Sequence, residues 1–338
     1  MAKVGIKDIA RIANVSLATV SRTLRTPDLV QEATRQRVLD AVAESGYRPN
    51  RMGMNLRTQR TGNIMVVIPD ITNPFNADLI RSIEETASSH GYAVLLGDTQ
   101  SSPESEKQYV DLVEVGQADG LLYFSGRNPF NINPDKPLLD QIPTMVNSNE
   151  ELDLEGIDKV LLDNAKAAHE AVQYLLALGH TRIAAVTGPM NTKSANGRLQ
   201  GYRDALEQAG LIVDDKLIIE GDYHIDAGVE ATEKLLQLKQ RPTAIFCFND
   251  DMAIGAINVL QANDYRVPED MSVIGFDNIL YSTYVRPALT TVSQPVEEIG
   301  RLCAEKLIAR LRGVHSEPST EYVSHQLVIR DSTGPAPE

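Results

Sequence analysis

The sequence predicts an α/β protein in which a small helical head precedes a larger body built on parallel β-sheets. Three short helical patterns occupy residues 6–46. From residue 63 onward, buried-strand runs alternate with helical stretches about every 25 residues, which is typical of parallel sheets covered by helices. The charge also divides the chain. Residues 1–60 carry a net charge of +6, within a chain of 338 residues whose net charge is −14.

The first two helical patterns have the spacing of a helix-turn-helix. IKDIARIA begins after Gly5, which is acceptable at an N-cap, and Asn14 tolerates the left-handed backbone of the turn that follows. Ser16 then caps a second helix, because its hydroxyl can accept one of the unpaired N–H groups there. The residues expected to face inward are Ile6, Ile9, Ala10, Ala13, Val20 and Leu24.

A third helical pattern spans about 32–45, with Val38, Leu39 and Val42 expected on its buried side. Gly46 ends this helix, and Pro49 confirms the stop.

The outward face of the second helix is a candidate DNA-binding surface. In a helix-turn-helix this helix enters the major groove, where arginine pairs with guanine, small apolar groups meet thymine methyls, and hydroxyls contact bases or phosphates. A basic head on an acidic body also fits contact with phosphates through the head alone. A solvated helix face without a partner is the alternative. The candidates are Leu17, Ala18, Thr19, Ser21 and Arg22.

The composition and the motifs disfavour several other functions. No apolar run approaches a membrane span, and the N-terminus lacks the pattern of a signal peptide, so we expect a cytoplasmic protein. Cys247 and Cys303 fit buried thiols, and none of the six histidines has a ligand spacing, so no metal or cofactor is expected. No GxSxG motif, Gly-rich phosphate loop or Cys–His pair predicts catalysis.

The head resembles that of a known family. KDIARIANVSLATVSRTL, followed by VQEATRQRVLDAVAESGYRPNRMGMNLR, is similar to the DNA-binding head of the lactose/galactose repressor family, with VSxxTVSR, TRxRV and GYxPN in order. The resemblance covers essentially the whole chain. It implies a transcriptional regulator, most simply a repressor, that binds a palindromic double-stranded operator as a homodimer and senses a small polar metabolite.

The resemblance also implies a hinge helix after GYxPN. Asn50 and Leu56 are assigned to DNA contact there, Leu56 as a wedge between base pairs in the minor groove. So short a helix is marginal in water, so we expect it to form only on DNA and beside its dimer mate. Gly53 stands where alanine is expected, and glycine costs about 1 kcal/mol in a helix interior.

For the body, the family implies a two-lobed architecture of the periplasmic-binding-protein type. The chain crosses between the lobes three times, with the ligand bound between them. The expected parts are 1–49 for the helix-turn-helix domain, 50–61 for the hinge helix and linker, 62–162 plus 293–320 for the first lobe, 163–292 plus 321–332 for the second, and 333–338 for a tail.

The candidate effector site lies beyond the carboxyl ends of the strands, where doubly wound sheets bind ligands. Carboxylates, amides, a fork-shaped arginine and aromatic rings there suit a polyhydroxylated ring. The family match assigns Arg198 and Asp277 most firmly and Asn249 next, with Phe75 and Tyr223 stacking; Ser125 and Asn149 complete the set. The alternative is that Asp or Asn at a strand end caps the next helix, as we expect for Asp250 and Asp251.

The effector class and the dimer surface follow from finer resemblances. SGRNPF, MVNSNEE and the GDY turn are most similar to the cytidine-repressor branch, so a nucleoside is expected first and a sugar second. Dimerisation is expected around Ile80, Ile83 and Tyr284, without a tetramerising C-terminal helix. The alternative functions are a non-catalytic sugar-binding protein of periplasmic type and an enzyme that uses the same cleft.

Overall fold

The structure is a computed structural model that describes residues 4–47, 60–314 and 316–337. The chain forms two units, Met1–Thr61 and Gly62–Glu338, which are described separately below. In the described ranges, no helix has both the length and the apolar character needed to cross a membrane.

Residues 4–47 of the head form three helices, and local signals set their ends. Ser16 Oγ accepts the backbone N–H of Thr19 at 3.1 Å and so caps the second helix. Asn14 and Gly46 adopt the left-handed backbone, with φ of 51° and 64°. Both lie where the sequence predicts a turn or a helix end. The helices are α1 (Ile6–Ile12), α2 (Leu17–Arg25) and α3 (Glu32–Ser45), and a 3-10 turn spans η1 (Pro27–Leu29).

A small apolar core holds the three helices together. Ile9, Val20 and Val38 are fully buried in it. One expectation for α3 is wrong, because Leu39 is 42% exposed and Ala41 is buried in its place. The helical repeat of 3.6 residues explains this, since positions three or four apart share a face and Leu39 follows Val38 directly.

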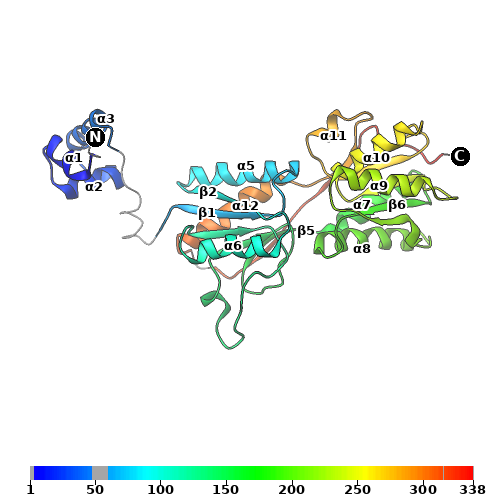
Figure 1. The fold of residues 1–338 in the computed structure, drawn as a ribbon, viewed down its shortest axis with the longest axis horizontal. Coiled ribbons are helices and arrows are strands. Elements are labelled where there is room, and N and C mark those ends of the chain that lie inside the picture. Colours follow the sequence, from blue (N-terminus) through cyan, green and yellow to red (C-terminus); the bar gives the residue numbers. More distant parts are fainter. Residues whose placement is uncertain (1–3, 48–59, 315, 338) are drawn as a thin grey trace. The chain divides into compact units, whose positions relative to one another are not determined.

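The body begins with a six-stranded parallel sheet covered on both faces (Figure 1). Helices α5 (Pro74–Ser89) and α12 (Val296–Leu311) pack together on one face, and α6 (Pro103–Glu114) covers the other. The strand order is β11 (Thr320–Val323), β5 (Asp158–Leu162), β4 (Met145–Ser148), β3 (Gly120–Tyr123), β1 (Asn63–Ile68) and β2 (Ala93–Asp98). A 3-10 turn spans η2 (Leu138–Asp140).

Side chains of β1 alternate between the two faces of this sheet, as the pleat requires. Ile64, Val66 and Ile68 belong to the core that contains residues of α5 and α12. Met65 and Val67 belong to the core that contains residues of α6. All five are buried, which is why this segment reads as a continuous apolar run.

The second sheet repeats the arrangement. Helices α7 (Asn164–Ala177) and α8 (Lys193–Gln208) pack together, as do α9 (Ile225–Leu236) and α10 (Asp250–Ala262). The strand order is β12 (Gln326–Val328), β10 (Thr290–Ser293), β9 (Ser272–Asp277), β8 (Ala244–Cys247), β6 (Ile183–Thr187) and β7 (Ile218–Glu220). Two short elements are α11 (Tyr281–Tyr284) and η3 (Asp215–Leu217). Only the β10–β12 pair is antiparallel among the described strand pairs.

The chain passes between the two sheets three times, after β5, after β10 and after β11. The last crossing differs from the expected boundary at residue 320, because β11 pairs with β5 in the first sheet. Strand β10 was not predicted from the sequence. It has only four residues, three of them threonine or serine, so it does not form an apolar run long enough to be recognised.

Candidate functional site

In the head, the N-terminal half of α2 carries the predicted DNA-binding residues on its surface. Leu17 is 44% exposed, and Ala18 and Arg22 are also exposed. Thr19 and Ser21 are half-buried. The outward set is therefore one small apolar patch and one arginine on the same short helix.

Two details refine this surface. The hydroxyl of Thr19 lies 2.8 Å from that of Ser16, so Thr19 takes part in the helix cap. Thr23, which the sequence did not single out, is buried and donates its hydroxyl hydrogen to the carbonyl of Thr19. Asn50 and Leu56, the two hinge residues assigned to DNA, lie outside the described residues.

In the body, two neighbouring cavities that share lining residues lie between the two sheets, at the carboxyl ends of strands from both; we call the smaller the inner chamber and the larger the outer chamber. The inner chamber has a volume of about 110 Å³ and the outer chamber about 580 Å³, and both are lined by Phe124, Glu150 and Tyr223. Of the seven predicted effector residues, five line the inner chamber, namely Phe75, Asn149, Arg198, Tyr223 and Asp277. Ser125 lines the outer chamber.

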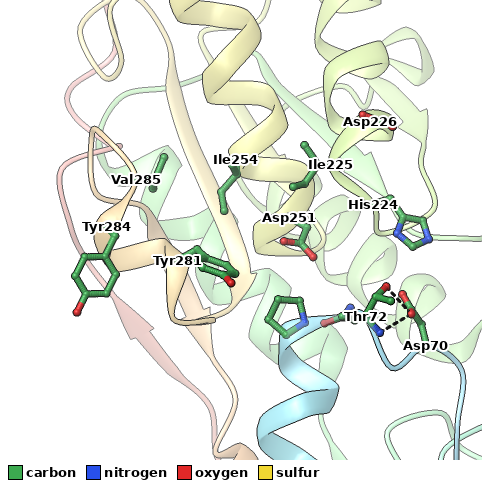
Figure 2. A pocket seen from close by; sticks show the side chains of 12 residues that line it. Asp70, Thr72, His224, Ile225, Asp226, Asp251, Ile254, Tyr281, Tyr284 and Val285 are labelled. Carbon is green, nitrogen blue, oxygen red and sulfur yellow. Dashed lines mark hydrogen bonds between the residues drawn. The ribbon is translucent and has the colours of Figure 1, made fainter. Parts of the chain in front are cut away.

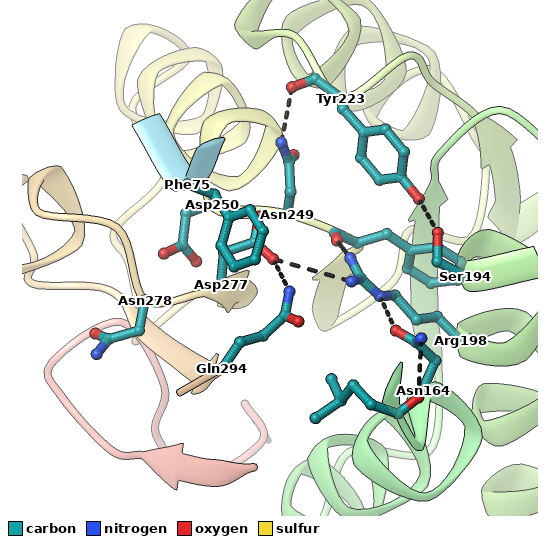
Figure 3. A network of polar contacts seen from close by, with 12 residues as sticks. Phe75, Asn164, Ser194, Arg198, Tyr223, Asn249, Asp250, Asp277, Asn278 and Gln294 are labelled. Carbon is teal, nitrogen blue, oxygen red and sulfur yellow. Dashed lines mark hydrogen bonds and ion pairs between the residues drawn. The ribbon is translucent and has the colours of Figure 1, made fainter. Parts of the chain in front are cut away.

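Arg198 lines the inner chamber and is held there by several contacts (Figure 3). It projects from α8 and is 6% exposed. Its Nε donates to Asn164 Oδ1 at 2.9 Å, and its Nη1 donates to the carbonyl oxygen of Phe248. The guanidinium also stacks on Phe276, with Cζ 3.6 Å from the ring centroid. One edge of the guanidinium, at Nη2, faces Asp277.

Asp277 closes the other side of this polar pair. Its Oδ1 lies 3.9 Å from Arg198 Nη2, beyond hydrogen-bond distance, and accepts a hydrogen bond from Gln294 Nε2 at 2.7 Å. Burial raises the pKa of Asp277 to about 6, although Arg198 and Gln294 favour the charged form. The carboxylate is therefore incompletely compensated, and ligand hydroxyls can supply the hydrogen bonds that the protein does not.

Three of the lining residues adopt a backbone conformation that residues other than glycine rarely use. Asn149, Tyr223 and Asp277 have φ values of 62°, 73° and 108°. Such conformations cost about 1 kcal/mol or more each and cluster at functional sites. The Tyr223 hydroxyl lies 3.3 Å from that of Ser194, and its ring lies against Gly188, where a Cβ would come within 2.0 Å of the ring. The absence of a side chain at Gly188 thus makes room for the aromatic wall.

Asn249 is the predicted residue that does not line either chamber. It is 2% exposed, its Oδ1 accepts the N–H of Met252 at 3.0 Å, and its Nδ2 donates to the carbonyl of Tyr223 at 2.7 Å. It therefore caps α10 and supports the backbone of Tyr223 (Figure 3). The capping expectation for Asp250 and Asp251 is wrong, because Asn249 is the cap and both lie in the first turn of α10. Asp250 instead accepts hydrogen bonds from the N–H of Ile279 and the hydroxyl of Thr291.

Comparisons with known proteins agree along the whole chain. Residues 5–50 match the model for bacterial regulatory proteins of the lacI family, and residues 172–333 match that for a periplasmic binding protein-like domain. The HTH-type transcriptional repressor CytR of Escherichia coli (strain K12) is 42% identical, over 98% of this chain and 97% of its own. The chain belongs to the lacI family of bacterial regulatory proteins.

Two further matches span nearly the full length of this lacI-family member. Catabolite control protein A of Priestia megaterium is 37% identical, over 98% of this chain and 99% of its own. A crystal structure of the lac repressor dimer bound to operator and the anti-inducer ONPF has a TM-score of 0.85 at 26% identity, covering 98% of this chain and 99% of that chain. The two-lobed, periplasmic-binding-protein-like body predicted from the sequence is thereby confirmed.

The lacI-family cleft contains a contact between lobes that the sequence did not reveal. Glu150, just after β4 of the first sheet, accepts the N–H of Ser194 at 3.1 Å and also its hydroxyl hydrogen. Ser194 lies in the first turn of α8, beside the second sheet. Burial raises the pKa of Glu150 against the opposing effect of Ser194 and Arg198. Glu150 thus joins the two lobes where the chambers meet.

The predicted dimer residues differ in exposure. Tyr284 is 66% exposed and Ile80 is half-buried, whereas Ile83 is fully buried in the core. The expectation for Ile83 is therefore wrong, because this face of α5 packs on the sheet and on α12. Tyr284 borders a surface pocket of about 780 Å³ with Tyr281, on the α11 segment (Figure 2).

Proposed function

We propose that this lacI-family protein is a repressor that binds a palindromic operator as a homodimer and responds to a small polar effector bound between its lobes. The observation that carries the proposal is the pairing of Arg198 with Asp277 inside an aromatic-lined cleft, in a chain whose head exposes Arg22 on a helix-turn-helix. The regulators CytR and catabolite control protein A are similar along their full lengths, which supports the same role.

For DNA, the proposed base contacts are made by the outward face of α2, and the hinge contributes further contacts. Arg22 donates to a guanine, while Leu17 and Ala18 meet apolar groups in the major groove. The full set is Leu17, Ala18, Thr19, Ser21 and Arg22, with Asn50 and Leu56 from the hinge. The protein acts in the cytoplasm, at the nucleoid when it is bound to DNA.

For the effector, a nucleoside is the first candidate and a sugar the second. Asp277 can accept two vicinal hydroxyls, Arg198 can donate beside it, and Phe75 and Tyr223 offer ring faces. The outer chamber of about 580 Å³ leaves room for a second ring beyond the sugar, which favours a nucleoside. The proposed contacts are Phe75, Ser125, Asn149, Arg198, Tyr223 and Asp277, with Asn249 acting through Tyr223.

We propose no turnover of the effector. The chambers join a carboxylate, a guanidinium and amides that suit binding, and no nucleophile–base pair was predicted from the sequence. The alternative of a sugar-binding protein of periplasmic type explains the two-lobed body, but it does not explain the helix-turn-helix head.

A paired measurement tests the proposal. The full chain is screened by thermal shift against nucleosides and sugars, because a ligand that binds the native state raises the melting temperature. Each hit is then added to titrations of a palindromic operator selected in vitro from random DNA. We expect one ligand class to raise the melting temperature and change operator affinity, and Arg198→Ala to abolish both effects. Selection without a palindrome, or effector effects that persist in Arg198→Ala, would contradict the proposal.

A further inference from the structure

The outer chamber contains a polar cluster around Glu106, of which only Ser125 belongs to the predicted effector set. Glu106 on α6 is 2% exposed, and its carboxylate lies against Ser125 and Arg127 in the wall of the chamber. A carboxylate this deeply buried is costly unless it is paired and hydrogen-bonded. The arrangement of its partners shows what it does for the chamber.

Glu106 fixes Ser125 as a hydrogen-bond acceptor. The Ser125 hydroxyl donates its only hydrogen to Glu106 Oε1 at 2.9 Å. Ser125 Oγ also accepts the backbone N–H of Arg127 at 3.2 Å, which uses one of the two lone pairs of the serine oxygen. A ligand that reaches Ser125 therefore meets the remaining lone pair and can only donate to it.

Glu106 also holds the guanidinium of Arg127 in position. Arg127 Nη1 lies 3.2 Å from Glu106 Oε2 and donates to the carbonyl of Ser101 at 3.2 Å. Ser101 and its neighbour Gln100 both have left-handed backbones, with φ of 57° and 49°, which indicates that the loop is held in an unfavourable conformation beside the chamber. Nη2 and Nε make no hydrogen bond to any residue in the described part of the chain, so these N–H groups remain to donate to a ligand.

We propose that the outer chamber reads the hydrogen-bonding edge of a nucleobase through Ser125 and Arg127, with Glu106 as the residue that positions both. This rests on the proposed function, in which the ribose hydroxyls bind Asp277 and Arg198 in the inner chamber. Ring amides and amidines carry a donor beside an acceptor in one plane, which complements an acceptor-only serine beside a donor-only guanidinium. Sugar hydroxyls rotate and both donate and accept, so a second sugar does not need a wall of fixed polarity.

Glu106→Gln tests the positioning role. The amide retains an acceptor but places an N–H₂ group against either the Ser125 hydroxyl or Arg127 Nη1. In the first case Ser125 loses its fixed polarity, and in the second Arg127 loses the group that holds it. The matched control is Glu114→Gln, which changes an exposed carboxylate in the last turn of the same helix. Binding of cytidine, uridine, adenosine, inosine and D-ribose to the full chain is measured by calorimetry. Ribose reports on the inner chamber alone.

We expect Glu106→Gln to weaken the tightest nucleoside about tenfold while ribose changes less than about twofold. Glu114→Gln should change neither, and Arg198→Ala should weaken both. Ser125→Ala removes the acceptor without changing a charge, so it should give the same selective loss, and it carries the test if Glu106→Gln does not fold.

Two results would overturn the proposal, and they differ in what else they affect. If the variants weaken nucleoside and ribose equally, or weaken neither, Glu106 has no role in reading the base, and the proposed effector function is untouched. If the wild-type protein binds sugars but no nucleoside, both the base-reading chamber and the choice of a nucleoside are wrong, while a sugar-responsive repressor remains.

Discussion

Effector binding should weaken as the pH falls through about 6, because Asp277 must be ionised to accept ligand hydroxyls. Burial raises the pKa of this carboxyl from 3.8 to about 6 in the folded protein. The ionised form therefore costs stability above pH 6, by about 3 kcal/mol for a shift of about two units. That cost disappears as the pH falls through 6 toward the unfolded pKa. Ligand hydroxyls that donate to the carboxylate offset the same cost, so they favour its ionised form.

The size of the pH effect follows from the pKa. If only the ionised form binds, the apparent Kd equals the intrinsic Kd multiplied by one plus the ratio of protonated to ionised carboxyl. That factor is about 1.1 at pH 7 and about 11 at pH 5, so affinity should fall about tenfold over this range. Glu150 also lines the chamber and has a raised pKa, so it is the other carboxyl whose titration must be separated from that of Asp277.

Calorimetric titrations with the tightest ligand between pH 5 and pH 8 provide the measurement. Asp277→Asn should bind weakly with a flat pH profile, and it should melt at a higher temperature than the wild type at pH 7, because it removes the uncompensated buried charge. Glu150→Gln should retain the wild-type slope. A wild-type affinity that stays constant from pH 5 to pH 7, or a slope that survives in Asp277→Asn, would refute the assignment of the hydroxyl acceptor to Asp277.

Four further changes test the head, the cleft wall and the hinge. Arg22→Ala should cost about 1–3 kcal/mol on the cognate operator and far less on random DNA in gel-shift titrations at fixed salt; equal losses would make Arg22 a phosphate contact. Ser16→Ala should lower the stability of the head by about 1 kcal/mol through loss of its cap, measured by thermal melting of the full chain. Gly188→Ala places a Cβ within 2.0 Å of the Tyr223 ring, so calorimetry should show weaker effector binding with operator affinity intact. Gly53→Ala should tighten operator binding by up to about 1 kcal/mol; weaker binding would contradict a hinge that folds on DNA.

The sequence alone was sufficient wherever the deciding contact is local. Ser16 caps α2 through a residue three positions away, and Gly46 ends α3 by its own backbone conformation. The buried strands of the body could also be predicted, because burial on both faces leaves continuous apolar segments in the sequence. The motif of the head then pointed to the family, and with it to Arg198 and Asp277, which the structure brings within 3.9 Å of each other.

Only the tertiary structure decided the pairings that join distant segments. Glu150 meets Ser194 across 44 positions of the sequence, and Ser125 meets Glu106 across 19. Ile83 was expected at the dimer surface but faces the core. The reason is that α12, from near the end of the chain, packs on α5. Hydrophobic periodicity fixes which face of an element is apolar, but not which element covers it. That choice depends on the order of strands in each sheet, and only the resulting fold places the half-buried carboxylate of Glu150 where the two lobes meet.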